Sequence, residues 1–130
     1  MKIALVPILA VIIFASCNKG VENGSTEFVV RVDSLSHTSF AASNDTITLR
    51  FFGTIGPDGC CSFSHFQTTR QPLQLDLTVW GQRTAAEACP AVMVYLNGKE
   101  YKFFLGEMGW FKINIHQPDA SVIRDSIIVK

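Results

Sequence analysis

The sequence predicts an all-β domain over residues 27–130, an antiparallel β-sandwich of about seven to eight strands. Three observations predict this fold class. Apolar and polar residues alternate with a period of two in several short runs, turn signals recur between the runs, and after residue 26 no run has the 3.6-residue period of an amphipathic helix. Together they are typical of two packed sheets joined by short turns.

The first two strands are expected at residues 28–33 and 45–55, on either side of a loop rich in Ser, Thr and Ala. In the second run Ile47, Leu49 and Phe51 alternate with mostly polar residues. Because successive side chains of a strand point to opposite faces, one face of each strand is predicted to be buried.

Residues 56–59, Gly-Pro-Asp-Gly, are a predicted turn, because Pro57 presets its φ and Gly59 tolerates a positive φ. Strands are expected after this turn at residues 61–67 and 72–80. The second has the clearest alternation in the chain, since an aliphatic residue occupies every second position of its centre.

Asn97-Gly98 predicts a tight hairpin between strands at 91–96 and 100–105, because both residues accept the positive φ of a type I′ turn. The only local helix propensity after residue 26 lies in Thr84–Ala88, which can form one turn before Pro90 stops it.

The chain closes with two alternating runs, at residues 109–116 and 122–129, joined by a polar turn. They resemble the last two strands of the immunoglobulin-like and fibronectin-type-III-like modules of bacterial lipoproteins. Phe111, after Gly109, stands where those modules usually have Tyr. The resemblance implies an immunoglobulin-like sandwich, which is a statement about architecture and not about function.

The first 16 residues are expected to be a signal peptide. One basic residue, Lys2, precedes an uncharged run of 13 residues that contains Pro7 and is shorter than the roughly 20 residues of a spanning helix. Ile13–Cys17 resembles the lipobox of bacterial lipoproteins, although Phe14 replaces the usual Leu. The resemblance implies a diacylglycerol on Cys17 and cleavage before it. A retained anchor and an ordinary export signal are the alternatives.

Cleavage before Cys17 leaves 114 of the 130 residues, with residues 17–26 as a polar, lipidated tether. The mature chain is nearly neutral, so it lacks the basic field of a nucleic-acid-binding protein. Its expected place is the cell envelope, held to a membrane by the lipid. The outer membrane, facing the periplasm, is favoured over surface exposure because Asn18 is not the Asp associated with inner-membrane retention and no acidic run follows Cys17.

Three cysteines remain besides Cys17: Cys60, Cys61 and Cys89. In an oxidising compartment the expected arrangement is one disulfide from Cys60 or Cys61 to Cys89, with the other cysteine buried or free. A vicinal Cys60–Cys61 bridge, fully reduced cysteines and a metal site are the alternatives.

Five aromatic residues fall out of phase with the predicted core and are candidates for a binding surface: Phe52, Phe66, Trp80, Phe104 and Trp110. Outward aromatic rings bind sugars by stacking and protein partners by burial. The alternative is satellite packing beneath loops.

Three tripeptides are similar to the Asp-Ser/Thr-aliphatic acceptor of a bacterial O-glycosylation system, which implies modification at Ser34, Thr46 and Ser126. Ordinary strand-start residues are the alternative explanation.

No catalytic motif, metal-ligand spacing or cofactor-binding motif is recognisable. The sequence therefore predicts a non-catalytic, lipid-anchored envelope module that binds a protein partner or a glycan, or serves as a structural subunit. The alternative is a small envelope enzyme or thiol-redox protein that uses Cys60 and Cys61.

Overall fold

The computed structural model describes residues 24–86 and 88–130, and within them the chain is all-β, with eleven strands and no helix. The strands are β1 (Ser25–Val29), β2 (Ser34–Ser36), β3 (Phe40–Ala41), β4 (Thr46–Phe52), β5 (Thr54–Gly56), β6 (Cys61–Gln71), β7 (Gln74–Thr84), β8 (Val94–Tyr95), β9 (Lys99–Phe104), β10 (Gly109–His116) and β11 (Val122–Val129).

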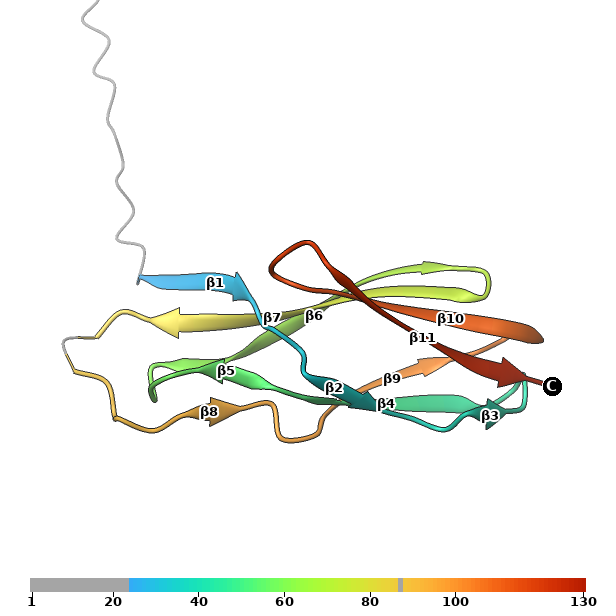
Figure 1. The fold of residues 1–130 in the computed structure, drawn as a ribbon, viewed down its shortest axis with the longest axis horizontal. Helices are drawn as coiled ribbons and strands as arrows, with labels where there is room; N and C mark the ends of the chain where they lie inside the picture. Colours follow the sequence, from blue (N-terminus) through green and yellow to red (C-terminus); the bar gives the residue numbers. More distant parts are fainter. Residues whose placement is uncertain (1–23, 87) are drawn as a thin grey trace, which may run out of the picture.

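The strands form three sheets around one core. The largest contains β1, β7, β10, β11 and β3 in that order, with β6 also paired to β7. β2, β4 and β9 form the second sheet, and β5 pairs with β8 in the third. Figure 1 shows the chain entering β1 at one end of the long axis and ending after β11 at the other.

The core is built from the alternating residues that the sequence predicts to face inward. Ile47, Leu49 and Phe51 of β4 are buried, as are the corresponding residues of β7 and β10. The inward residues of those two strands are Leu75, Leu77, Val79, Phe111, Ile113 and Ile115. Burial of each such side chain stabilises the fold by about 1.5–3 kcal/mol, so the period-two pattern itself specifies the face that packs.

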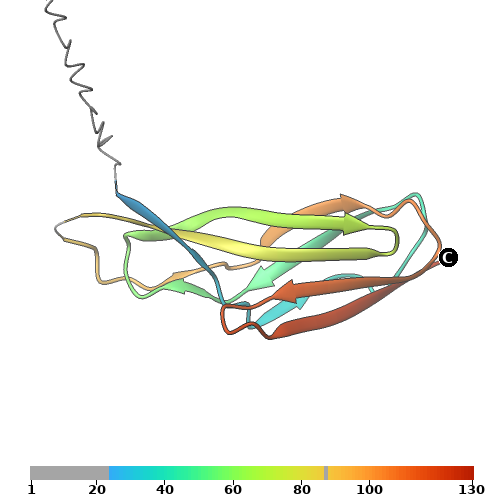
Figure 2. The ribbon, with the colours of Figure 1, turned by 90° about the horizontal axis from the view of Figure 1, so that it is seen from above.

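The larger sheet is mixed, which corrects the expectation of a purely antiparallel architecture. β10 pairs with β7 in parallel, and β3 pairs with β11 in parallel. Alternation along a strand shows which face is buried but carries no information about the direction of the neighbouring strand. Between β7 and β10 the chain passes through β8 and β9 of the other sheets, and this crossover returns it to the end where β7 began (Figure 2).

The number of strands also exceeds the predicted seven to eight. The Ser-, Thr- and Ala-rich stretch expected to be a loop contributes β2 and β3, and Gly53 divides the predicted second strand into β4 and β5. β1 begins at Ser25, inside the segment expected to be a tether. No helical turn follows β7 in the described residues, and Glu87 lies outside them.

The hairpin predicted at Asn97-Gly98 is wrong, although both residues do have positive φ, 50° and 79°. The strands on either side of this pair bond to β5 and β4 and not to each other. Backbone bonds from Leu96 and Gly98 to the carbonyls of Gly53 and Phe51 bridge the two pairings. The Lys99 amide also bonds to the Leu96 carbonyl (3.1 Å), so the predicted tight turn does form at the dipeptide. It interrupts one long antiparallel run and does not join two paired strands. The final hairpin, β10 and β11, is confirmed.

β7 is shared by three strands. β6 pairs along residues 74–83 of β7, so β1, at residues 80–84, and β10, at residues 74–77, must both lie on the opposite edge. β1 is antiparallel to β7 and β10 is parallel to it, so the two approach each other head-on along that edge.

Gln117, directly after β10, closes the gap where β1 and β10 meet. Its Nε2 donates to the Val32 carbonyl (2.7 Å), and its Oε1 accepts from the Val32 amide (3.0 Å). Gln117 is the buried polar side chain of this core, 8% exposed. The amide thus replaces the strand partner that Val32 lacks.

We expect Gln117→Ala to lower the free energy of unfolding by about 2–4 kcal/mol, because it leaves a buried amide and a buried carbonyl without partners. Urea denaturation measures the change. Gln71→Ala, at an exposed glutamine at the end of β6, is the matched control and should change stability by less than about 0.5 kcal/mol. Equal effects of the two substitutions would contradict the bridging role.

Candidate functional site

The outward side chains of β6, β7, β10 and β11 make one continuous polar surface. The strand register places Gln71, Gln74, Lys112 and Ser126 in one row and Thr69, Asp76, Asn114 and Arg124 in the next. Directly opposed residues of paired strands point to the same face. With Gln67, Thr78 and His116, which continue the same strands, these residues are called the polar face below.

Asp76 organises the centre of the polar face. Its carboxylate accepts hydrogen bonds from Gln74 Nε2 (2.8 Å) and Asn114 Nδ2 (3.2 Å), and His116 Nε2 lies 3.0 Å from it. The bond from Gln74 is the main cause of the lowered pKa of Asp76; burial opposes it, and the bonds from His116 and Asn114 add to it. Three neighbouring side chains are thereby fixed in position.

An open depression of about 510 Å³ lies on this face. It is lined by Gln74, Lys112, Asn114, Arg124, Asp125 and Ser126. The lining combines two cations, two amides, a carboxylate and a hydroxyl. Such groups can donate hydrogen bonds to a polar ligand and accept them from it.

Trp80 and Trp110 lie at opposite ends of the polar face. Trp80 is half-buried, stacks on His65 with 6.1 Å between ring centroids, and donates from Nε1 to Gln67 Oε1 (2.8 Å). Trp110 is 62% exposed. Lys112 is level with Gln74, so Trp110 is eight residues from the level of Trp80, which corresponds to roughly 26 Å along the strands.

The other three predicted aromatic residues do not join this surface. Phe52 and Phe104 are exposed on the β2-β4-β9 sheet. Phe66 does not face outward, because a β-bulge between Phe63 and His65 shifts the phase of β6. Its ring instead packs against Phe51, Phe63 and Tyr101.

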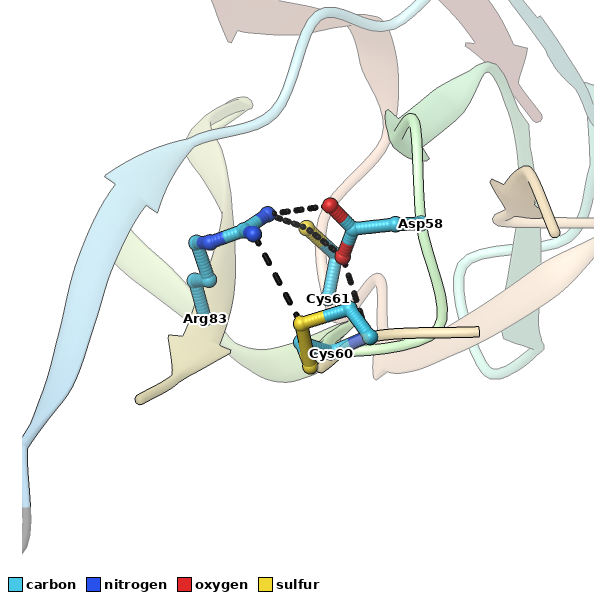
Figure 3. The surroundings of a disulfide bond; sticks show 5 residues. Asp58, Cys60, Cys61 and Arg83 are labelled. Atoms are coloured by element: carbon cyan, nitrogen blue, oxygen red, sulfur yellow. Dashed lines mark hydrogen bonds and ion pairs between the residues drawn. A yellow bond between two sulfur atoms is a disulfide. The ribbon is translucent and has the colours of Figure 1, made fainter. Parts of the chain in front are cut away.

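The disulfide joins Cys60, in the turn after β5, to Cys89, in the segment after β7. This is one of the two predicted pairings, and Cys61 is left as a buried thiol. Figure 3 shows the Arg83 guanidinium beside the bridge, with Nη1 at 2.7 Å from Asp58 Oδ2 and 3.5 Å from the Cys61 sulfur. Its Nη2 lies 3.7 Å from the Cys89 sulfur.

The pair with Arg83 is the main cause of the lowered pKa of Asp58, and the pKa of Arg83 is raised in turn. Ligand atoms of Asp58, Cys60 and Cys89 lie within 4.8 Å of one another. Both sulfurs are consumed in the disulfide, however, and a metal ion binds thiolates. The arrangement therefore holds a bridge and not a metal centre while the disulfide is closed.

Ser64, His65 and Glu27 form a further cluster at the bulge of β6. His65 Nδ1 lies 2.9 Å from Ser64 Oγ and 3.5 Å from Glu27 Oε1, and Ser64 Oγ donates to the same carboxylate. A catalytic triad needs the nucleophile and the acid on different nitrogens of the imidazole. Here one nitrogen faces both groups, so the cluster is not arranged as a proton relay.

The remaining predicted site residues are dispersed. Ser34 and Thr46 are exposed at the starts of β2 and β4, and Ser126 is half-buried in β11. Cys17 and the signal peptide at residues 1–16 lie outside the described residues. No helix in the described part of the chain is long and apolar enough to cross a membrane.

Nothing in the sequence singles out the residues at the centre of the polar face. Gln74, Asp76, Lys112 and Asn114 are visible only as the outward phase of two predicted strands. Their adjacency depends on the parallel pairing of β7 and β10, which a sequence period does not encode. Searches against protein-family models, curated proteins and solved structures found no match.

We expect Asp76→Asn to lower the free energy of unfolding near neutral pH and to have less effect as the pH falls below about 4. A lowered pKa means that the carboxylate stabilises the fold above its ordinary value of 3.8, and that this contribution is lost as the pH falls through the folded-state pKa. Urea unfolding of both proteins from pH 7 to pH 3 measures the difference.

Asp33→Asn is the matched control for this titration, because Asp33 is exposed and makes no ion pair within residues 24–86 and 88–130. A difference between the wild type and Asp76→Asn that stays constant across the whole pH range would contradict the assignment.

Proposed function

We propose that the protein is a lipid-anchored, non-catalytic module of a bacterial cell envelope that binds a glycan or a protein partner through the polar face. The observation that carries the proposal is a preorganised polar surface with a tryptophan at each end, Trp80 and Trp110. Hydrogen-bonding side chains fixed by their neighbours lose little conformational freedom when a ligand binds. Nearby aromatic rings supply apolar contact area.

The architecture within this proposal is an immunoglobulin-like sandwich. Support comes from the inward residues of β4, which pack with those of β7 and β10 in one core, and from the β10–β11 hairpin. Two parallel pairings, of β10 with β7 and of β3 with the end of β11, depart from a simple antiparallel sandwich.

The anchor within this proposal is a lipid on Cys17, in the outer membrane and facing the periplasm. The lipobox resemblance of residues 13–17 supports it, and the Cys60–Cys89 disulfide suits an exported protein. The first described residues enter β1 at the end of the molecule opposite the C-terminus (Figure 1). The start of β10, with Trp110, therefore lies far from the attachment point of the tether.

In a Gram-negative host we expect the wild type in the membrane fraction, with an intact mass raised by lipid, and Cys17→Ala in the soluble fraction without that mass. A single acyl chain binds a membrane only marginally, whereas two or more hold a protein there stably. Cys61→Ala is the matched control and should stay lipidated and membrane-bound. Release of both variants, or of neither, would contradict anchoring through Cys17.

The soluble, full-length Cys17→Ala protein also tests binding, by titration with purified envelope polysaccharides and by capture of detergent-solubilised envelope proteins. Adding Trp80→Ala or Trp110→Ala should weaken binding about tenfold, the usual cost of removing an anchoring aromatic. Tyr95→Ala removes from β8 an aromatic residue that is 56% exposed, close to the 62% of Trp110, and should leave binding unchanged. Binding that survives both tryptophan substitutions would overturn the role of the polar face.

A thiol-redox role is the second candidate, and the contacts of Arg83 with the Cys61 and Cys89 sulfurs favour it. In this reading the Cys61 thiolate attacks the Cys89 sulfur, a Cys61–Cys89 bond forms, and Cys60 leaves as a thiolate. No external oxidant is needed, since one disulfide replaces another. The Arg83 guanidinium lies against both the attacking and the attacked sulfur, 3.5 Å from that of Cys61 and 3.7 Å from that of Cys89.

This exchange predicts that Cys60→Ser, isolated from the periplasm, contains a Cys61–Cys89 disulfide. Peptide mapping after alkylation of free thiols identifies the bridge. Cys61→Ser is the control and should retain the Cys60–Cys89 bridge. Free thiols at both Cys61 and Cys89 in the Cys60→Ser protein would rule the exchange out.

A further inference from the structure

Two cations of the polar face have no acidic partner. Lys112 and Arg124 both line the 510 Å³ depression, and neither makes an ion pair among the described residues. Lys112 is opposite Ser126, and Arg124 is opposite Asn114, so the two are diagonal neighbours on adjacent strands. Diagonal neighbours have Cα atoms about 7–8 Å apart, a separation that long side chains span easily.

The carboxylates near these cations are already engaged. Asp76 accepts from Gln74 and Asn114 and contacts His116. Asp125, which also lines the depression, pairs with His37 (2.8 Å) through Oδ2 and accepts from its neighbour's backbone amide through Oδ1. The lining of the depression thus carries a formal charge of +1, from Lys112 and Arg124 against Asp125, with the Asp76 carboxylate beside it. Neither cation is paired with these carboxylates, whose oxygens bond to other groups.

The amides beside the cations are oriented for hydroxyl groups. The side-chain nitrogens of Gln74 and Asn114 are both held by Asp76, so their carbonyl oxygens remain to accept hydrogen bonds from a ligand. The Ser126 hydroxyl lines the same depression. A ligand that matches these groups has hydroxyl donors around a central anion, and an acidic sugar has this chemistry.

The length of the face indicates a chain of sugars and not a single one. The depression lies between Trp110 and the level of Trp80, positions that are roughly 26 Å apart along the strands. Between these levels the outward residues of β6, β7 and β10 are all polar, and the apolar ones of β11, Val122 and Ile128, lie at the ends, opposite His116 and Trp110. A protein partner would require an apolar patch at the centre of its interface, whereas a polysaccharide requires hydrogen-bonding groups with aromatic rings for stacking.

We propose that the polar face binds an acidic polysaccharide, with a carboxylate or sulfate group held between Lys112 and Arg124 and flanking sugars extending toward the two tryptophans. This proposal rests on the proposed function, because it names the ligand class of the same face. Gln74 and Asn114 accept hydrogen bonds from the hydroxyls beside the anion.

The test is calorimetric titration of the full-length Cys17→Ala protein with three polymers: polygalacturonate, a sulfated glycosaminoglycan and neutral dextran. Lys112→Gln and Arg124→Gln should each raise the Kd for one acidic polymer about tenfold, the usual cost of losing one charge-assisted hydrogen bond. Raising NaCl from 50 to 300 mM should weaken this binding further, because salt screens exposed charges. The polymer that binds distinguishes carboxylate from sulfate.

Lys102→Gln is the matched control, since Lys102 is an exposed lysine of β9 on another sheet. It should leave the Kd unchanged. Unchanged binding of both acidic polymers to Lys112→Gln and Arg124→Gln would overturn the anionic site, as would failure of the unsubstituted protein to bind either polymer. Tryptophan-dependent binding of dextran alone would overturn it while leaving the proposed function standing. Capture of a protein in place of any polymer would likewise overturn the anionic site and leave the proposed function standing.

Discussion

The fold depends on β7, whose backbone is paired on both edges and by three different strands. β6 covers one edge, and β1 and β10 divide the other. Two strands that meet head-on leave unpaired backbone groups at their junction, and a buried unpaired group costs about 1–3 kcal/mol. The Gln117 amide removes this cost by bonding both polar groups of Val32. One side chain thus allows an antiparallel strand and a parallel strand to share an edge.

The same pairing creates the candidate site. Asp76 and Asn114 come from strands that are far apart in sequence, and the parallel register of β7 and β10 places them side by side. Their hydrogen bond, with those from Gln74 and His116, converts four separate polar residues into a fixed array. An antiparallel neighbour in place of β10 would present a different row to β7. The chemistry of the face therefore follows from the topology and not only from composition.

The sequence predicts burial well and adjacency poorly. Leu75, Leu77 and Val79 are buried as their spacing indicates, because the hydrophobic effect acts on each side chain individually. The prediction that Phe66 faces outward is wrong, because one bulge, invisible in the sequence, reverses the phase of β6 beyond it. Asn97-Gly98 has the predicted positive φ values and the turn bond from the Lys99 amide to the Leu96 carbonyl, yet the flanking strands pair with β5 and β4 and not with each other. Local sequence rules predict the backbone conformation of a residue, whereas the strand it pairs with depends on contacts distant in sequence.

The charges of the polar face favour ligand binding over a structural role. A purely structural surface gains little from placing Lys112 and Arg124 near each other, since like charges on adjacent strands repel and exposed pairs contribute under about 1 kcal/mol even when they are opposite. Arg50 and Glu100, opposed on β4 and β9, show the ordinary arrangement, in which a cation faces an acid across two strands. On the polar face the acids bond instead to amides and histidines. Lys112 and Arg124 are therefore left without an acidic partner among the described residues, and this is the charge that the proposed acidic ligand would meet.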